Sequence, residues 1–263
     1  MTTALTAAPP RTDFLGLDFT NATMTDMLDW LAGRGAGDRF AYVVTPNVDH
    51  IVRLQQADEA VVRAYRAADR CLCDSRILAR LAHFHGVTLT LVPGSDLTRL
   101  ALERVFRPGD RLCLIGGTAD MPGRLEARYP GLVIIQHRAP MGLLHDAAAR
   151  RAAIDAAAAS QARAILLAVG APQQELLAWE MQASGRVSGT ALCIGASIDF
   201  LTGAQRRAPL PVQRAGLEWA WRLASEPRRL WRRYLVDGPA IFPIVRRWAR
   251  GHKRTNGRAG TGR

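Results

Sequence analysis

The sequence predicts an α/β protein whose mostly parallel sheet is covered by helices on both faces. Six short, β-rich apolar runs alternate with longer segments that have helical patterning. The runs are nearly continuous in apolar character, as expected of strands buried on both faces. The chain has 263 residues, of which 48% are hydrophobic, so it is long enough to bury a large core.

The strands and helices follow one another in a regular order. The expected strands are AYVVTP (41–46), RCLCD (70–74), RLCLIGG (111–117), LVIIQHR (132–138), AILLAVG (164–170) and GTALCIGA (189–196). A helix from residue 47 to about residue 67 should follow the first strand, and helices SRILARLAHF, ADMPGRLEARY and PQQELLAWEMQA should follow later ones. We expect an α/β core at 14–204, a helical appendage at 205–250, and disordered ends at 1–13 and 251–263.

Polar residues and glycines stand where each expected strand ends. They are Thr45 and Asn47, Asp74, Gly116 and Gly117, Gln136 and His137, Gly170 with the following APQQE, and Asp199. In open α/β sheets, ligands bind beyond the carboxyl ends of the strands, so these positions predict the rim of one cleft. At any single position, a polar residue is as typical of an ordinary strand end as of a ligand site. The prediction therefore rests on the coincidence over six strands.

Two of these residues have a functional and a structural interpretation each. Asp74 directly follows the apolar CLC, where partial desolvation would raise the pKa of a carboxylate and suit it to general-base chemistry. Asp is also a common N-cap, and spacing alone favours Asp74 as the cap of a helix that begins at Ser75. Asn47 is ambiguous in the same way.

The glycine-rich and glutamine-rich turns are equally open. LIGGTADMPG lacks a phosphate-loop lysine and the full G-x-G-x-x-G pattern, so Gly116 and Gly117 indicate either phosphate approach or a tight turn. After Pro172, Gln173 and Glu175 can face the cleft, or Glu175 can serve as a first-turn carboxylate. The chain has no D-x-D and no paired-histidine pattern, so the sequence supports no metal-bridged diphosphate site.

The net charge of +12 lies entirely at the C-terminal end of the chain. Residues 205–263 contain fourteen arginines and one lysine against three acidic residues, and residues 1–204 are neutral. A neutral body with a basic end is typical of a core tethered to an anionic partner. The four cysteines have no metal-ligand spacing, which indicates reduced thiols in a cytoplasmic protein, and no apolar stretch reaches the roughly 18 residues of a membrane span.

The basic end contains a two-faced helix. Arg228, Arg229, Arg232 and Arg233 fall on one arc, and Leu230, Trp231, Tyr234 and Leu235 fall on the opposite arc. Ser225 is the expected N-cap, and Gly238-Pro239 is expected to stop the helix. A basic helix with an apolar, tryptophan-bearing side suits an anionic membrane surface. An apolar face docked on the core, and a nucleic-acid contact without a stacking platform, are the alternatives.

Taken in order, the motifs resemble the WecG/TagA/CpsF bacterial glycosyltransferases. The matching pieces are VVTPNVDHI, CDSRILARL, VPGSDL, LCLIGG, ARYPGLVI, LLAVGAPQQE and IGASIDFLTGAQRRAPLPVQRAGLEWAWRLASEPRRLWRRYL, which cover residues 40–237 approximately. The ordered series RAP, GLEW, RL, EP and RRYL is the most specific part. The resemblance implies a Rossmann-like, GT-E-like core with a basic helical appendage.

The resemblance also implies an activity and a site. It implies inverting transfer of a hexose from a UDP-sugar to a polyprenyl-diphosphate-linked sugar, without a metal cofactor, at the cytoplasmic face of the cell membrane. Asp74 would be the general base, Thr45 and Asn47 would line the acceptor side, and Gln173 would match the glutamine of a P-x-Q-E block. The donor side would comprise Gly116, Gly117, Gln136, Gly170, Gln173, Glu175 and Asp199. The acceptor diphosphate and the membrane would be met by Arg206, Arg207, Arg214, Arg222, Arg228, Arg229, Arg232 and Arg233.

Two residues depart from the family pattern. Ser75 stands where the family has glycine, and Leu91 stands where it has arginine, so glucose or a uronic acid is as good a donor as N-acetylmannosamine. A non-catalytic membrane-bound scaffold and a basic-arm nucleic-acid-binding protein are the competing hypotheses. We expect no nucleic-acid partner, and the sequence leaves self-association open.

Overall fold

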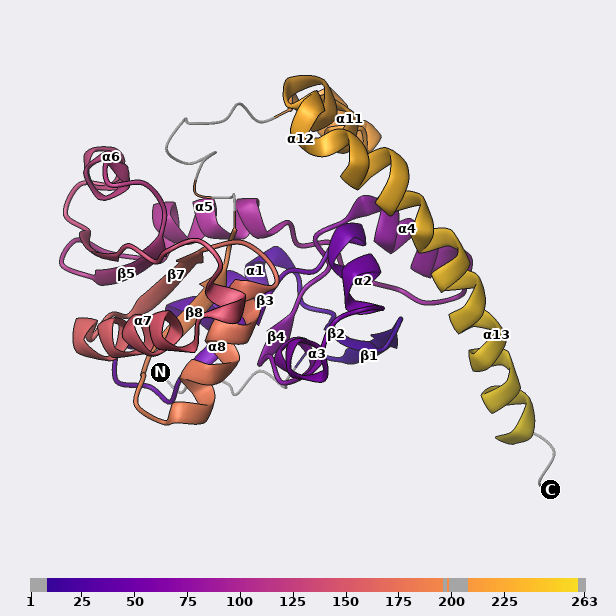
Figure 1. The fold of residues 1–263 in the computed structure, drawn as a ribbon, viewed down its shortest axis with the longest axis horizontal. Coiled ribbons are helices and arrows are strands. Elements are labelled where there is room, and N and C mark those ends of the chain that lie inside the picture. Colours follow the sequence, from indigo (N-terminus) through magenta and orange to yellow (C-terminus); the bar gives the residue numbers. More distant parts are fainter. Residues whose placement is uncertain (1–8, 196–197, 199–207, 260–263) are drawn as a thin grey trace.

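The computed structural model describes residues 9–195, 198 and 208–259 (Figure 1). The central sheet has six strands, all parallel, in the order β4-β3-β8-β7-β5-β6. Their bounds are β3 Ala41–Val44, β4 Arg70–Cys71, β5 Arg111–Gly116, β6 Val133–His137, β7 Ala164–Ala168 and β8 Thr190–Cys193. The predicted α/β sheet is therefore confirmed.

Helices cover both faces of the sheet, and alternate strand residues feed two separate cores. Tyr42 and Val44 of β3 face one core and Val43 faces the other, as the twofold repeat of a strand requires. The first face is covered by α2 Val48–Leu54, α3 Glu59–Arg66, α4 Arg76–Phe84, α7 Ala147–Ser160 and α8 Gln173–Ser184. The second face is covered by α1 Met24–Ala32, α5 Gly94–Arg104 and α6 Met121–Arg128.

The chain begins with structure that we did not expect. Residues 1–13 were predicted to be disordered, but β1 Arg11–Phe14 pairs antiparallel with β2 Leu17–Thr20. Phe14 is fully buried in the first core, and this burial explains why the hairpin is ordered.

The helix expected from residue 47 to about residue 67 is two helices, α2 and α3, separated by residues 55–58. Gln56, Ala57 and Asp58 in this break line a cavity of about 220 Å³. Tyr65 of α3 is buried and closes one side of it. The break between α2 and α3 therefore borders a cavity at the carboxyl edge of the sheet.

The appendage is a chain of short helices followed by one long helix. It comprises α10 Leu210–Ala215, α11 Glu218–Ser225, α12 Pro227–Trp231, a π-helical turn η2 Arg232–Asp237, a 3-10 turn η3 Gly238–Ala240 and α13 Ile241–Ala259. Gly238-Pro239 does not stop the helix as predicted, since proline is tolerated in the first turn of the next helical segment. Ser225 ends α11 and does not cap α12, whose N-cap is Glu226.

The long helix α13 runs along the side of the core past α4 (Figure 1). Ile241 and Val245 are buried in the first core, and Trp248 stacks edge-on against Phe14 at 4.9 Å between ring centroids. The disorder expected from residue 251 is wrong as far as Ala259, which ends α13. Among the described residues, no helix is long and apolar enough to cross a membrane.

Candidate active site

Asp74 and Thr45 converge on the start of α5. Asp74 follows β4, is partly buried, and its Oδ1 accepts a hydrogen bond of 3.1 Å from the amide of Gly94. A Cβ at Gly94 would lie 2.7 Å from the Thr45 hydroxyl oxygen, so only glycine lets the helix start approach Thr45 this closely. The V-P-G-S-D-L segment therefore brings a third element to the two predicted site residues.

The structure decides between the two interpretations of Asp74 raised by the sequence. Ser75 is the N-cap of α4, because its hydroxyl accepts the amide hydrogen of Leu78 at 3.2 Å. Asp74 is thus not that helix's cap, and the serine at the family's glycine position supplies a cap of its own. Asp74 instead meets the positive end of α5, where the helix dipole favours an anion. Leu91 packs against the first core, and its backbone forms an isolated parallel bridge with Cys73, next to Asp74.

Asn47 does serve as a helix cap. Its side chain accepts from the amides of Asp49 and His50, and the His50 imidazole Nδ1 accepts from the Asn47 amide at 3.1 Å. Burial, together with the nearby cations of Arg233 and Arg53, lowers the pKa of His50 to about 3. His50 is therefore neutral at physiological pH, as its hydrogen-bond acceptance requires.

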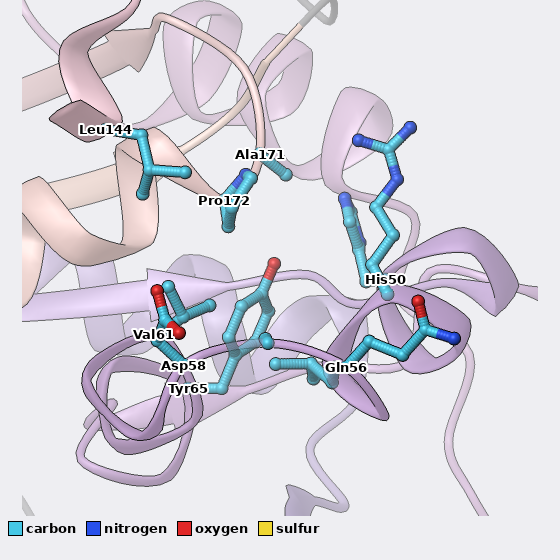
Figure 2. A pocket seen from close by; sticks show the side chains of 11 residues that line it. His50, Gln56, Asp58, Val61, Tyr65, Leu144, Ala171 and Pro172 are labelled. Carbon is cyan, nitrogen blue, oxygen red and sulfur yellow. The ribbon is translucent and has the colours of Figure 1, made fainter.

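The cavity lies beside His50, between α2, α3 and the entry to α8 (Figure 2). Figure 2 shows the Tyr65 hydroxyl pointing from one wall toward Pro172 on the other. Leu144, from the 3-10 turn η1 Leu143–His145, completes the apolar side. The cavity thus sits at the carboxyl edge of the sheet, where α/β proteins bind ligands.

The predicted donor-side glycines lie across the sheet, at the ends of β5 and β7. Gly116 has a φ of +94°, and a Cβ there would lie 2.8 Å from Val169, so the two strand ends approach closely. Gln136 donates from its amide nitrogen to the carbonyls of Gly116 and Thr118, at 2.9 Å each. The chain leaves β5 and β7 in opposite directions along the sheet, which is the topology that opens a ligand crevice.

The α8 entry corrects two predictions. Counted from Pro172, the glutamine of P-x-Q-E is Gln174, not Gln173. Gln174 is buried, and its Oε1 accepts from the Gly195 amide at 2.9 Å, whereas Gln173 bonds the backbones of Val169 and Leu144. Glu175 does not face the cleft, because only 1% of its surface is exposed.

Glu175 is nonetheless a chemically unusual group. Its Oε1 accepts from the side-chain nitrogen of Gln174 at 2.9 Å, and the Tyr65 hydroxyl is a second neighbour. Desolvation raises the pKa of Glu175 to about 7, although the bonds from Gln174 and Tyr65 lower it in part. Such a shift marks either a functional group or a buried structural network.

The predicted arginines separate into two environments. Arg228, Arg229 and Arg232 are exposed, while Arg233 turns to the core and pairs with Asp49 of α2 at 3.2 Å. Asp49 also pairs with Arg53 at 3.1 Å. Arg222 is partly buried on α11, Arg214 lies on α10, and Asp199, Arg206 and Arg207 lie outside the described residues.

The apolar arc predicted for this helix is only partly docked. Leu230 is buried, but Trp231 and Leu235 are 51% and 56% exposed. Val236 and Phe242 continue the exposed apolar surface. The appendage thus presents exposed arginines and exposed apolar side chains together.

A family model for the WecG/TagA/CpsF glycosyl transferases matches residues 12–255 of this chain. The match covers both the sheet and the appendage. The chain belongs to this family. It is therefore a sugar-transferring enzyme by descent, and the cluster around Asp74 is a candidate for the chemistry.

Four residues of this site were not singled out by the sequence. Gly94 and Gln174 lie within quoted motifs, and the P-x-Q-E spacing alone would have found Gln174. His50 and Tyr65 carried no readable signal, because their roles arise from burial and from contacts with other elements.

Proposed function

We propose that this protein transfers a hexose (glucose, N-acetylmannosamine or a uronic acid) from a UDP-sugar to a polyprenyl-diphosphate-linked sugar, with inversion. The product would extend a bacterial exopolysaccharide or another cell-surface polysaccharide. The observation that carries the proposal is the convergence of Asp74, Thr45 and Gly94 at the carboxyl edge of the sheet, within a chain of this family.

Asp74 is the proposed general base. The Gly94 amide fixes one carboxylate oxygen, so the carboxylate is oriented before substrate binds. It removes the proton of the acceptor hydroxyl as that oxygen attacks C1 of the donor sugar from the face opposite UDP. One direct displacement of this kind inverts the configuration at C1, and UDP leaves with the bonding electron pair.

Arginines of the appendage are proposed to bind the diphosphate of the lipid-linked acceptor, without a metal ion. Guanidinium groups bind phosphate oxygens bidentately and keep their charge at every physiological pH. Arg233 shows that the appendage reaches α2, the helix capped by Asn47. The neighbouring exposed arginines are therefore well placed to meet an acceptor that arrives from outside the core.

The appendage is also the proposed membrane contact. Trp231, Leu235 and Phe242 are more than half exposed in a segment rich in arginine. This combination favours an anionic bilayer surface, here the cytoplasmic face of the cell membrane, where a polyprenyl-linked acceptor resides.

A donor panel tests the proposal. The purified protein is mixed with UDP-glucose, UDP-N-acetylmannosamine or a UDP-uronic acid, and with vesicles that contain membrane lipid acceptors. We expect UDP release from at least one donor only when acceptor is present, with an undiminished rate in EDTA. Absence of acceptor-dependent release over the whole panel would favour the scaffold hypothesis.

A further inference from the structure

The burial of Glu175 needs a physical explanation. A first-turn glutamate gains from the helix dipole while it remains in water, so capping α8 does not require burial. Glu175 is instead 1% exposed, and its Oε2 has no hydrogen-bond partner of standard geometry among the described residues. Burial of a carboxylate is costly unless its hydrogen bonds specify something useful to the fold or the site.

The bond from Gln174 to Glu175 fixes the direction of an amide. A carboxylate oxygen only accepts, so it must face the NH₂ group of Gln174. The carbonyl oxygen of the same amide then points to Gly195 and accepts its N–H at 2.9 Å. The acceptor at Glu175 and the donor at Gly195 thus favour the same orientation of the Gln174 side-chain amide.

Gly195 stands at a central point of the molecule. It follows β8, which lies between β3, the strand before Thr45, and β7, the strand before Gly170. The backbone N–H of Gln174 also donates to the Gly170 carbonyl at 3.1 Å. Gln174 therefore ties together the ends of β7 and β8 on the proposed donor side.

We propose that Glu175 is a positioning residue for the donor site: it orients the Gln174 side-chain amide, which holds Gly195 just after the end of β8. The kinetic consequence rests on the proposed function, but the positioning itself does not. Tyr65 extends the network to the wall of the cavity, because its hydroxyl is a neighbour of Glu175 and its side chain lines that cavity.

Nuclear magnetic resonance of the unmodified protein gives the first test. Glu175 titrates near pH 7, and its ionisation strengthens the bond from Gln174. The Gly195 amide resonance should therefore shift with an inflection near pH 7, although Glu175 does not touch Gly195. Glu175→Gln should remove the inflection, and a flat Gly195 titration in the unmodified protein would overturn the proposal.

Hydrogen exchange gives a second test in a variant. Glu175→Leu replaces a buried carboxylate by an apolar side chain of similar size and leaves the Gln174 NH₂ group without its acceptor. We expect exchange at the Gly195 amide to accelerate by up to about tenfold, because this N–H then keeps only its second acceptor, the Leu167 carbonyl at 3.2 Å. Gln173→Ala is the matched control, since Gln173 bonds Val169 and Leu144 and should leave Gly195 exchange unchanged. Unchanged Gly195 protection in Glu175→Leu, or equal acceleration in the control, contradicts the relay.

Kinetics separate positioning from mere stability. Glu175→Leu should raise KM for the UDP-sugar about tenfold and leave KM for the acceptor within about twofold, a coupling worth one hydrogen bond. Gln174→Leu should have the same effect, and the double variant should be no worse than either single one. Additive losses would overturn the positioning role. A protein that passes both Gly195 tests but turns over no donor would refute the proposed function alone.

Discussion

The α/β core and the C-terminal appendage treat their polar groups in opposite ways. In the core, the polar groups of the site are paired within the core itself: Asp74 with Gly94, Asn47 with His50, and Gln174 with Gly195. In the appendage, Arg228 and Arg232 are exposed beside the equally exposed Trp231. Residues 1–204 have no net charge, and residues 205–263 carry the whole net charge of +12.

This difference separates a preorganised part of the enzyme from a part that needs a partner. Hydrogen bonds that hold a carboxylate in place before substrate arrives lower the cost of reaching the transition state. Exposed arginines and apolar side chains gain free energy only when an anionic, partly apolar surface covers them. The two parts meet at Asp49, which pairs with Arg233.

The largest expected effect comes from the core. Asp74→Asn keeps an oxygen for the Gly94 amide but removes the base, so the transfer rate should fall by about 10²–10⁴-fold. Vesicle binding should stay as in the unmodified protein. Asp155→Asn, at an exposed ion pair with Arg186, is the control and should keep its full rate. Full activity in Asp74→Asn would remove Asp74 from the role of base.

The second effect is a pH dependence of stability that belongs to the core alone. The pKa of Glu175 is raised from 4.5 to about 7 in the folded protein, so between these values the unfolded chain has lost a proton that the native state keeps. The contribution of Glu175 to the free energy of unfolding should therefore fall as pH rises from 4.5 through 7, by about 3 kcal/mol.

Glu175→Gln isolates this contribution because glutamine does not titrate. Between pH 4 and pH 8, the free energy of unfolding of Glu175→Gln should rise by about 3 kcal/mol relative to that of the unmodified protein. Urea unfolding at several pH values measures it. A difference that stays constant with pH would show that folding does not raise the pKa of Glu175.

The smallest effect is expected at the junction. Asp49→Asn releases Arg233 from a partly buried ion pair, and we expect a loss of about 1–3 kcal/mol in the docking of the appendage. Limited proteolysis of residues 208–259 should accelerate, and transfer should slow. Glu59→Gln breaks a more exposed pair with Arg63 and should cost under about 0.5 kcal/mol. Equal effects of the two substitutions would mean that the junction does not hold the regions together.

The sheet was predictable because its signal is local. Six apolar runs with polar ends predicted every strand to within three residues at either end, and the largest differences are at the ends of β4 and β8. The break between α2 and α3 was not predictable, because Gln55–Asp58 contains neither proline nor glycine. The hairpin at Arg11–Thr20 was missed because its order depends on distant contacts, such as that between Phe14 and Trp248.

The site was predictable where chemistry follows from position in the chain, and not where it follows from burial. Asp74, Thr45 and Asn47 stand directly after strands, so topology alone placed them at one edge. Glu175 has the same sequence context, but rotation along α8 turns it into the core. The sequence also predicted that Arg233 lies on the same helix arc as Arg228, Arg229 and Arg232. That prediction assumed a regular α-helix, and the π-helical turn from Arg232 to Asp237 interrupts it.

The division between core and appendage is tested most directly by moving charge in one region and measuring both. In one variant Arg228, Arg229 and Arg232 become glutamine, and in its control the exposed core arginines Arg104, Arg107 and Arg128 do. Affinity for anionic vesicles and affinity for UDP are measured on both. Each arginine near an anionic membrane contributes about 1 kcal/mol to binding, so the appendage variant should bind vesicles about 100-fold more weakly. Its affinity for UDP should be unchanged. The control variant should keep both affinities. Undiminished vesicle binding by the appendage variant, or equal weakening in the control, would contradict the account.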